Sequence, residues 1–254
     1  MNYHEIDMTT DPRKAHFDHF RHAPNPHVGL TVDVDVTDFV RLCKARGWSF
    51  YLAFIRVAAM AANAVPELRR RIRGDQVLEY DRCDTSHIEL LESGAYCYCT
   101  LRHDPAQSWE DYMRYAAAQR ELAKTGASIE EEADVEGMYF ISTVPWLHYR
   151  EFSQPNYGTE ASNPAITWGK YEPDYRGRLM MPVSLLVHHS LVDGLQIAEF
   201  YRNLERIMER KATGASNESE ESDETDEETD PHIQPPLPCS SSGLRHQVQR
   251  NTQA

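Results

Sequence analysis

Apolar and polar residues alternate strictly in HVGLTVDVDV, residues 27–36, where Leu30 and four valines share one side of the alternation. A period of two is typical of a strand that buries one face, so we expect a half-exposed strand here. Residues 178–189, RLMMPVSLLVHH, contain the run VSLLV, which predicts a strand buried on both faces. Shorter runs predict further strands at QVLEY (76–80), SHIELL (86–91), AYCYCTL (95–101), MYFISTV (138–144) and AITWGKY (165–171).

Helical patterns separate these strands. Asp11 and Pro12 supply a cap and a first turn for a helix over residues 13–22. Ser49 precedes residues 50–65, which are apolar nearly all round and therefore predict a buried helix. Further helices are predicted at 37–47, at 108–124 after a capping-box pattern, and at 195–211. Because strands and helices are interspersed without strict alternation or repeats, we expect an α/β fold, a two-layer sandwich with a mixed sheet covered by helices.

The charge of the chain is unevenly spread. The formal net charge is −14, and residues 212–254 contain nine acidic residues against Arg245 and Arg250, which gives this stretch −7. It is also rich in Ser, Thr, Pro and Gln, so it cannot bury enough apolar surface to offset its ordering entropy. We therefore expect a catalytic domain over residues 1–211 and a disordered acidic tail over residues 212–254. Such a tail is either a solvated appendage or a binding segment for a basic partner.

Composition also argues against several classes of protein. The densest basic cluster, residues 69–73, is short and lies in an acidic chain, so we expect no nucleic-acid binding. The apolar run LAFIRVAAMAANAV is too short to span a bilayer and is interrupted by Arg56, and the first residues lack the pattern of a signal peptide. A protein without membrane contact, in the cytoplasm, is the expectation.

The candidate chemistry lies in VHHSLVDG, residues 187–194. Adjacent strand residues point to opposite faces, so His188 and His189 cannot serve one site unless the strand ends between them. A histidine in the following turn has the pKa range of a general base, near ~6.5, and Asp193 is positioned either to orient it or to brace the turn by pairing with an arginine. A metal hydrolase using these residues fits poorly because the two histidines diverge, so we expect no metal. No segment resembles a nucleophile elbow or a phosphate loop, so the nucleophile is expected to belong to the substrate.

The HHxxxDG pattern in this segment resembles the signature of the chloramphenicol acetyltransferase superfamily. Three more segments in the same order resemble the chloramphenicol acetyltransferases themselves, and the similarity spans roughly residues 1–210. These segments are PRKAHFDHFRH, FISTVPW and ITWGKY.

The resemblance implies an acetyl-CoA-dependent O-acetyltransferase that acetylates a hydroxyl of chloramphenicol and gives antibiotic resistance. It implies that His189 deprotonates the acceptor in a ternary complex, that Ser142 donates to the oxyanion, and that acetyl-CoA is a co-substrate. It also implies a salt bridge between Asp193 and Arg13, and a structural role for His188. Further implied positions are Thr167 in a water network at the oxyanion, Phe20, Tyr96 and Tyr98 in the acceptor pocket, and Trp146 and Tyr171 near the coenzyme.

The resemblance further implies a homotrimer with active sites between subunits. The acceptor pocket departs from the family pattern, because Phe20 replaces a frequent tyrosine and Tyr98 adds bulk and a hydroxyl where one member has alanine. The segment EFSQPNYGTE, residues 151–160, departs from it as well. An acetyltransferase of the same mechanism acting on another hydroxylated small molecule therefore stays an alternative, as do a metal hydrolase and an inactive trimer whose tail recruits partners.

Overall fold

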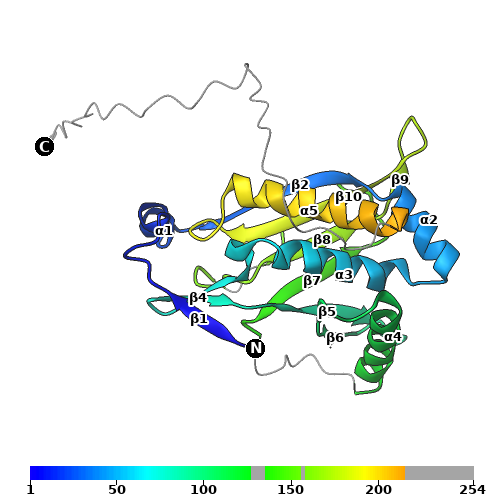
Figure 1. Cartoon of the computed structure of the whole chain (residues 1–254), viewed down its shortest axis with the longest axis horizontal. Helices are drawn as coiled ribbons and strands as arrows, with labels where there is room; N and C mark the ends of the chain where they lie inside the picture. The colour runs from blue at the N-terminus through cyan, green and yellow to red at the C-terminus, as the bar shows by residue number, and fades with distance from the viewer. Residues whose placement is uncertain (127–134, 156–157, 215–254) are drawn as a thin grey trace, which may run out of the picture. The chain divides into compact units, whose positions relative to one another are not determined.

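The structure is a computed structural model that describes residues 1–126, 135–155 and 158–214 (Figure 1). Its main sheet has the strand order β2-β10-β8-β7-β5-β6, with β9 paired to β10. The pairs β5–β7 and β7–β8 are parallel and the other pairs are antiparallel, so the sheet is mixed as predicted. The strands are β2 (His27–Asp35), β5 (Asp84–Leu90), β6 (Tyr96–Leu101), β7 (Met138–Val144), β8 (Ala165–Gly169), β9 (Glu172–Pro173) and β10 (Leu179–His188).

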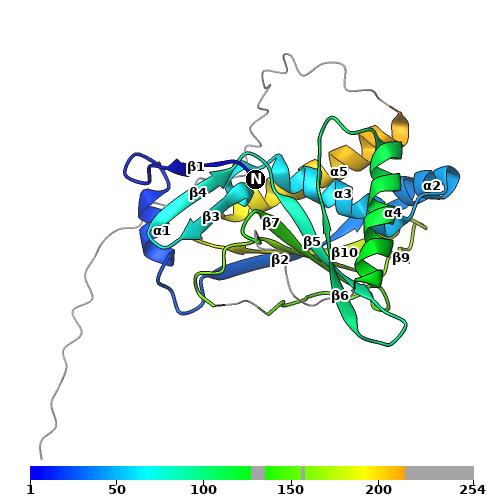
Figure 2. The same ribbon diagram turned by 90° about the horizontal axis from the view of Figure 1, so that it is seen from below.

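Helices cover one face of this sheet, and the two views show them on the same side of it (Figures 1 and 2). The period-two pattern of β10 explains which face the helices cover. Its residues Val183, Leu185 and Val187 point to that face and join the core beneath the helices. The molecule is therefore the expected α/β two-layer sandwich. The helices are α1 (Lys14–Phe20), α2 (Thr37–Arg46), α3 (Phe50–Asn63), α4 (Trp109–Thr125) and α5 (Gly194–Thr213), with a 3₁₀ helix η1 (Pro66–Arg69).

Local sequence signals set some of the helix boundaries, but the predicted cap by Asp11 is wrong, because α1 begins at Lys14 after Arg13 with no side-chain cap. Ser108 caps α4 by accepting a hydrogen bond from the backbone N–H of Asp111, as the capping-box pattern predicts. α5 continues to Thr213 and is followed by Gly214 in the left-handed conformation, so the folded part extends past the predicted boundary at 211. The remainder of the acidic tail lies outside the described residues.

A second, three-stranded sheet has the order β1-β4-β3, where β1 is Tyr3–Ile6, β3 is Arg70–Arg73 and β4 is Gln76–Tyr80. Neither β1 nor β3 was predicted, because both are short and carry no apolar alternation. The basic cluster is built into this sheet: Arg71 is fully buried and donates to the carbonyl oxygens of Leu68 and Met138. The Arg71 guanidinium group thus links η1 to β7.

The expectation for the apolar face of β2 was only partly correct. Val34 is buried, but Leu30 is 51% exposed although both lie on the same side of the strand. β2 is an edge strand of the sheet, and the Leu30 side chain stays exposed although Tyr201 of α5 donates to the Leu30 carbonyl oxygen. No described helix is long and apolar enough to cross a membrane.

Candidate active site

The backbone of His189 is held at the exact point where β10 ends. β10 stops at His188, and the turn that carries His189 leads to α5. The His189 N–H donates to the carbonyl oxygen of Pro26 at 2.7 Å, and its own carbonyl oxygen lies 2.7 Å from Nε2 of His16. Since a carbonyl only accepts, His16 donates this bond from its Nε2. Two segments that are distant in sequence therefore fix the main chain of His189.

The imidazole of His189 is oriented as well. Its Nδ1 lies 3.0 Å from the carbonyl oxygen of Val192, so Nδ1 carries the proton in the neutral ring. The ring also packs against Phe20 of α1, with ring centroids 4.1 Å apart. Among the described residues nothing hydrogen-bonds to Nε2. The unprotonated nitrogen is therefore the one available to accept a proton from a substrate.

His188 has the opposite character. It is buried, its Nε2 donates to the carbonyl oxygen of Thr159 at 2.9 Å, and its Nδ1 accepts from the Ser190 hydroxyl at 2.7 Å. Burial lowers the pKa of His188 to about 4. With both ring nitrogens occupied and the ring held neutral, this side chain supports the fold and cannot take a proton from a substrate.

Asp193 and Arg13 form an ion pair with Nη1 and Oδ2 2.6 Å apart. The other carboxylate oxygen of Asp193 accepts from the N–H of Leu195 at 3.0 Å and caps α5. Burial raises the pKa of this carboxyl, but the hydrogen bonds from Arg13 and from Leu195 outweigh it, so the net shift is downward. Because Val192 occupies Nδ1 of His189, Asp193 does not form a triad with it. The pair is only partly buried, since the Asp193 side chain is 34% exposed.

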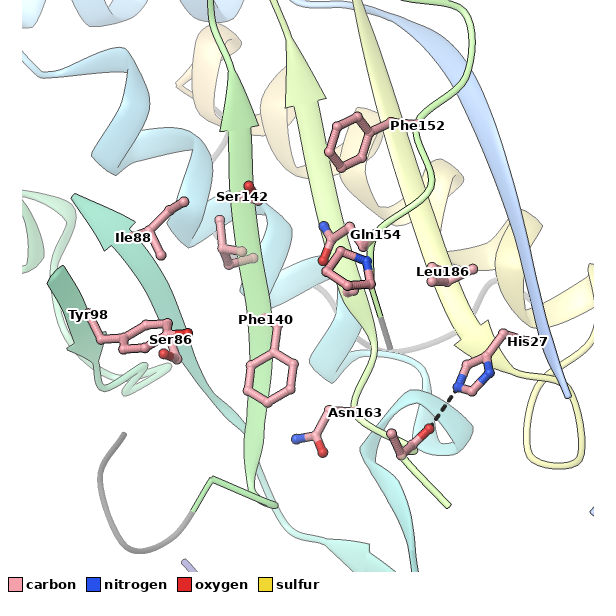
Figure 3. A pocket seen from close by; sticks show the side chains of 14 residues that line it. His27, Ser86, Ile88, Tyr98, Phe140, Ser142, Phe152, Gln154, Asn163 and Leu186 are labelled. Carbon is pink, nitrogen blue, oxygen red and sulfur yellow. Dashed lines mark hydrogen bonds between the residues drawn. The ribbon is translucent and has the colours of Figure 1, made fainter. Parts of the chain in front are cut away.

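Ser142 lies on the other face of the sheet, away from the helices. It lines a pocket of about 200 Å³ together with Tyr98, Phe140, Phe152, Gln154 and Leu186 (Figure 3). Leu186 alternates along β10 with the core residues Leu185 and Val187, which establishes that the pocket opens on the uncovered face. Apolar walls around a few polar groups are typical of a small-molecule site.

Thr167 is the cross-strand neighbour of Ser142, but it does not line the pocket. It is fully buried, and its hydroxyl accepts a hydrogen bond from the side-chain amide of Gln154. The resemblance implied that Thr167 contacts a water at the oxyanion. Within this chain the Thr167 hydroxyl is instead hydrogen-bonded to the side chain of Gln154. Sequence reasoning missed Gln154 as a site residue; the only signal was its place in the divergent segment 151–160.

The remaining predicted positions are scattered. Tyr98 lines the pocket, whereas Tyr96 at the start of β6 is 44% exposed and lies outside it. Trp146 follows β7 and is 64% exposed. Tyr171 follows β8, is half-buried and packs on Phe50, with ring centroids 5.5 Å apart. Phe20 does not line the pocket with Tyr98 and instead contacts His189.

Ser142 and His189 are far apart within one chain, although the pocket that Ser142 lines extends to His27 opposite the end of β10. In the sheet register Ser142 lies beside Thr167, and Thr167 lies beside Ser184, five residues before His189. Strand geometry then places Ser142 and His189 about 17 Å apart along the strands and about 10 Å apart across them. One reacting group cannot touch both residues of a single chain.

No group of three or more His, Cys, Asp or Glu side chains in the described ranges is arranged to hold a metal ion. The diverging His188 and His189 explain this for the histidine segment, since their rings contact different parts of the chain.

Comparisons with known proteins show the family of this chain. The profile of the family described as Chloramphenicol acetyltransferase matches residues 1–205. Chloramphenicol acetyltransferase 3 of Escherichia coli is 28% identical over 83% of this chain and 99% of its own length, and chloramphenicol acetyltransferase 2 of Haemophilus influenzae is 27% identical over 81% and 96%.

Solved structures agree in fold. One described as a chloramphenicol acetyltransferase matches with a TM-score of 0.71 and 25% identity over 82% of this chain and all of the other. A probable dihydrolipoamide acetyltransferase from Listeria monocytogenes matches with a TM-score of 0.60 and 18% identity, over 83% of this chain and 95% of that one.

The two-layer sandwich and the family match therefore define the chain as an acyltransferase. More narrowly, it belongs to the chloramphenicol acetyltransferase family, whose profile covers nearly all of its described residues.

Proposed function

We propose that this protein is an acetyl-CoA-dependent O-acetyltransferase that acetylates a hydroxyl of chloramphenicol and thereby gives antibiotic resistance. The names of the relatives support the substrates, since several are chloramphenicol acetyltransferases. The observation that carries the proposal is the hydrogen bond from Nδ1 of His189 to the Val192 carbonyl, which leaves Nε2 as the proton acceptor.

In the proposed mechanism Nε2 of His189 removes the proton from the acceptor hydroxyl. The oxygen attacks the thioester carbonyl of acetyl-CoA within a ternary complex, and Ser142 donates to the oxyanion of the tetrahedral intermediate. The intermediate collapses by breaking the carbon–sulfur bond, and the departing CoA thiolate takes the proton from the His189 imidazolium. The products are the acetate ester and CoA, and the ring of His189 is again neutral.

We further propose that the protein is a homotrimer in which His189 of one subunit meets the pocket of the next. The separation of His189 from Ser142 within a chain supports this assembly, because both must touch the reacting centre. The exposed Leu30 on the edge strand adds apolar surface for such a contact. We also propose that the protein acts in the cytoplasm, because its proposed co-substrate acetyl-CoA is an intracellular metabolite.

The coenzyme is proposed to bind beside the loop that follows β7. Trp146 is 64% exposed and Leu147 is 61% exposed, which leaves an apolar surface next to the strand of Ser142. Tyr171 is the second proposed contact. Acetyl-CoA serves as a co-substrate, and the mechanism uses no metal.

The acceptor pocket supports a second candidate, the same reaction on another hydroxylated small molecule. Tyr98 and Gln154 place polar groups among the apolar walls, and such groups favour an acceptor that presents polar groups to match them. Phe20 and Tyr96 are proposed pocket residues only in the assembled trimer, because neither lines the pocket of a single chain.

A thiol-release assay decides the function. Purified protein is incubated with acetyl-CoA and either chloramphenicol or a panel of other hydroxylated antibiotics, and free CoA is measured with a thiol reagent. Rapid release that requires chloramphenicol supports the first candidate, and release with another acceptor alone supports the second. Absence of acceptor-dependent release across the panel contradicts both.

A further inference from the structure

Gln154 stands between a buried hydroxyl and the pocket. Its side-chain amide donates to the hydroxyl of Thr167, which has no exposed surface, and Gln154 itself lines the pocket beside Ser142. Figure 3 shows its side chain over the sheet, between the strand of Ser142 and that of Leu186. The polar group that faces the pocket above Thr167 is therefore the amide of Gln154.

The segment that carries Gln154 is anchored to the same strand. The Tyr149 hydroxyl donates to the carbonyl oxygen of Thr167 at 3.0 Å and accepts from the Ser184 hydroxyl at 3.3 Å. The Ser184 hydroxyl in turn lies 2.7 Å from that of Thr31. The hydroxyls of Thr31, Ser184 and Tyr149 thus link β2 and β10 to the Thr167 carbonyl on β8 and fix the chain five residues before Gln154.

A primary amide has two N–H groups at a fixed angle in one plane. The bond to Thr167 uses one of them and leaves the other for a group in the pocket that Gln154 lines. Because Ser142 and Thr167 are cross-strand neighbours, their main chains are about 4.8 Å apart. The second N–H of Gln154 is then within reach of a group that also accepts from the Ser142 hydroxyl. In the described part of the chain, Ser142 makes no side-chain hydrogen bond of its own.

We propose that Gln154 is a second oxyanion donor in this protein, giving its remaining N–H to the intermediate that Ser142 also stabilises. Thr167 then acts through Gln154 by holding the amide, and it is a positioning residue. This inference rests on the proposed acetyl transfer and adds a catalytic group to it. Two preorganised donors stabilise a developing negative charge more than one, because neither has to reorient during the reaction.

The test uses the full-length protein, with kcat and KM measured by thiol release at saturating acetyl-CoA. Gln154→Leu removes the donor at similar size and is expected to lower kcat by about 10²-fold, while the KM for acetyl-CoA stays within about twofold. Gln154→Glu keeps the shape but replaces the donor by a carboxylate, so it is expected to lower kcat further. The matched control is Gln119→Glu on α4, which adds the same charge away from the pocket and is expected to be silent.

Thr167→Val gives the decisive comparison. If Thr167 acts through Gln154, its replacement lowers kcat in the wild type by about tenfold but has no further effect in the Gln154→Leu protein. Multiplied losses in the double variant would overturn the inference, and so would a Gln154→Leu protein that changes only the KM of the acceptor. Gln154→Met, also apolar and of similar length, replaces the leucine variant if that protein melts early.

These outcomes are separate from the fate of the proposed function. If the wild type releases no thiol with any acceptor, the proposed function fails before any variant is made. If Ser142→Ala is impaired while Gln154→Leu has the kcat of the wild type, only the role of Gln154 is lost.

Discussion

Arg13 and Asp193, 180 residues apart in sequence, lie 2.6 Å from each other and join the start of α1 to the first turn of α5. The pair encloses the turn in which His189 lies, so it braces the candidate base from outside. Phe20 and His16 reach the same ring from α1. Because α1 packs on the His189 ring, a shift of α1 away from α5 would also change the position of that ring.

We expect each of Arg13→Ala and Asp193→Ala to lower the free energy of unfolding by about 1–2 kcal/mol, less than for a fully buried pair, because Asp193 is 34% exposed and water screens it. Activity should fall with stability. The double variant should lose less than the sum of the two single losses, since no charge is left unpaired. Urea denaturation of the three variants measures this; strictly additive losses, or an unaffected Arg13→Ala protein, would show that the pair is not a brace. Asp193→Asn is the control that removes the charge and keeps a capping side chain.

The two histidines of the motif should respond differently to replacement. His189→Ala is expected to lower kcat by about 10²–10⁴-fold because the proton acceptor is lost, while the melting temperature falls only slightly with the loss of the bond to Val192 and the packing on Phe20. His188→Ala should instead lower the melting temperature, since the bonds to Thr159 and Ser190 disappear. Thiol release and thermal melts on both proteins distinguish the roles, and wild-type turnover in His189→Ala would refute the assignment of the base.

Stability should fall on acidification because two buried histidines are neutral in the fold. Burial lowers the pKa of His188 to about 4 and that of His103 to about 3, whereas an unfolded histidine titrates near 6.5. Below pH 6.5 the unfolded chain binds protons that the folded chain does not, so folding free energy is lost from pH 6.5 down to about 4 for His188 and about 3 for His103. For His188 the loss is at most about 3 kcal/mol.

Urea denaturation at several pH values between 7.5 and 4 tests this dependence. His188→Gln should be less stable than the wild type at pH 7.5, yet lose less stability than the wild type on going to pH 4.5. An identical pH dependence in the two proteins would mean that His188 is not the buried neutral group described here.

Mixed subunits test whether the active site is shared. His189→Ala and Ser142→Ala proteins are each expected to be nearly inactive, but a site built from His189 of one and Ser142 of the other is intact. Random mixing in a cyclic homotrimer makes about a quarter of the sites intact, so co-expression should restore about a quarter of the wild-type activity. Activity no higher than that of the Ser142→Ala protein would contradict a site formed between subunits. Sedimentation velocity on the wild type gives the number of subunits independently.

Truncation after Gly214 should leave thiol release and melting temperature unchanged. Residues 215–254 are strongly acidic and carry few large apolar side chains, so they offer little surface for burial. Truncation after Lys211 is the informative comparison. It removes residues 212–214, the end of α5 directly after Lys211, whose ammonium group lies over the rings of Trp48 and Trp109, 5.5 and 5.3 Å from their centroids. A large loss of stability after removal of residues 215–254 alone would show that they belong to the fold.

The sequence alone determined the features that depend on near neighbours. Alternation located β2 and β10, and the Ser108 pattern located the start of α4, because strand and helix periods and caps are properties of a few consecutive residues. The same local rule separated His188 from His189, since adjacent strand residues must diverge. The resemblance to a known family added roles for residues that no local rule connects, Arg13 and Asp193 among them.

Tertiary structure alone decided which of these residues meet. The insertion of β8 and β7 beside β10 places Ser142 next to Thr167 and far from His189, and that order depends on pairings between distant strands. β1 and β3 also exist only through such pairing, because their sequences have no apolar alternation. Gln154 became a site residue for the same reason: its amide acquires a role only where the chain after β7 folds back over Thr167, and no periodicity encodes that return.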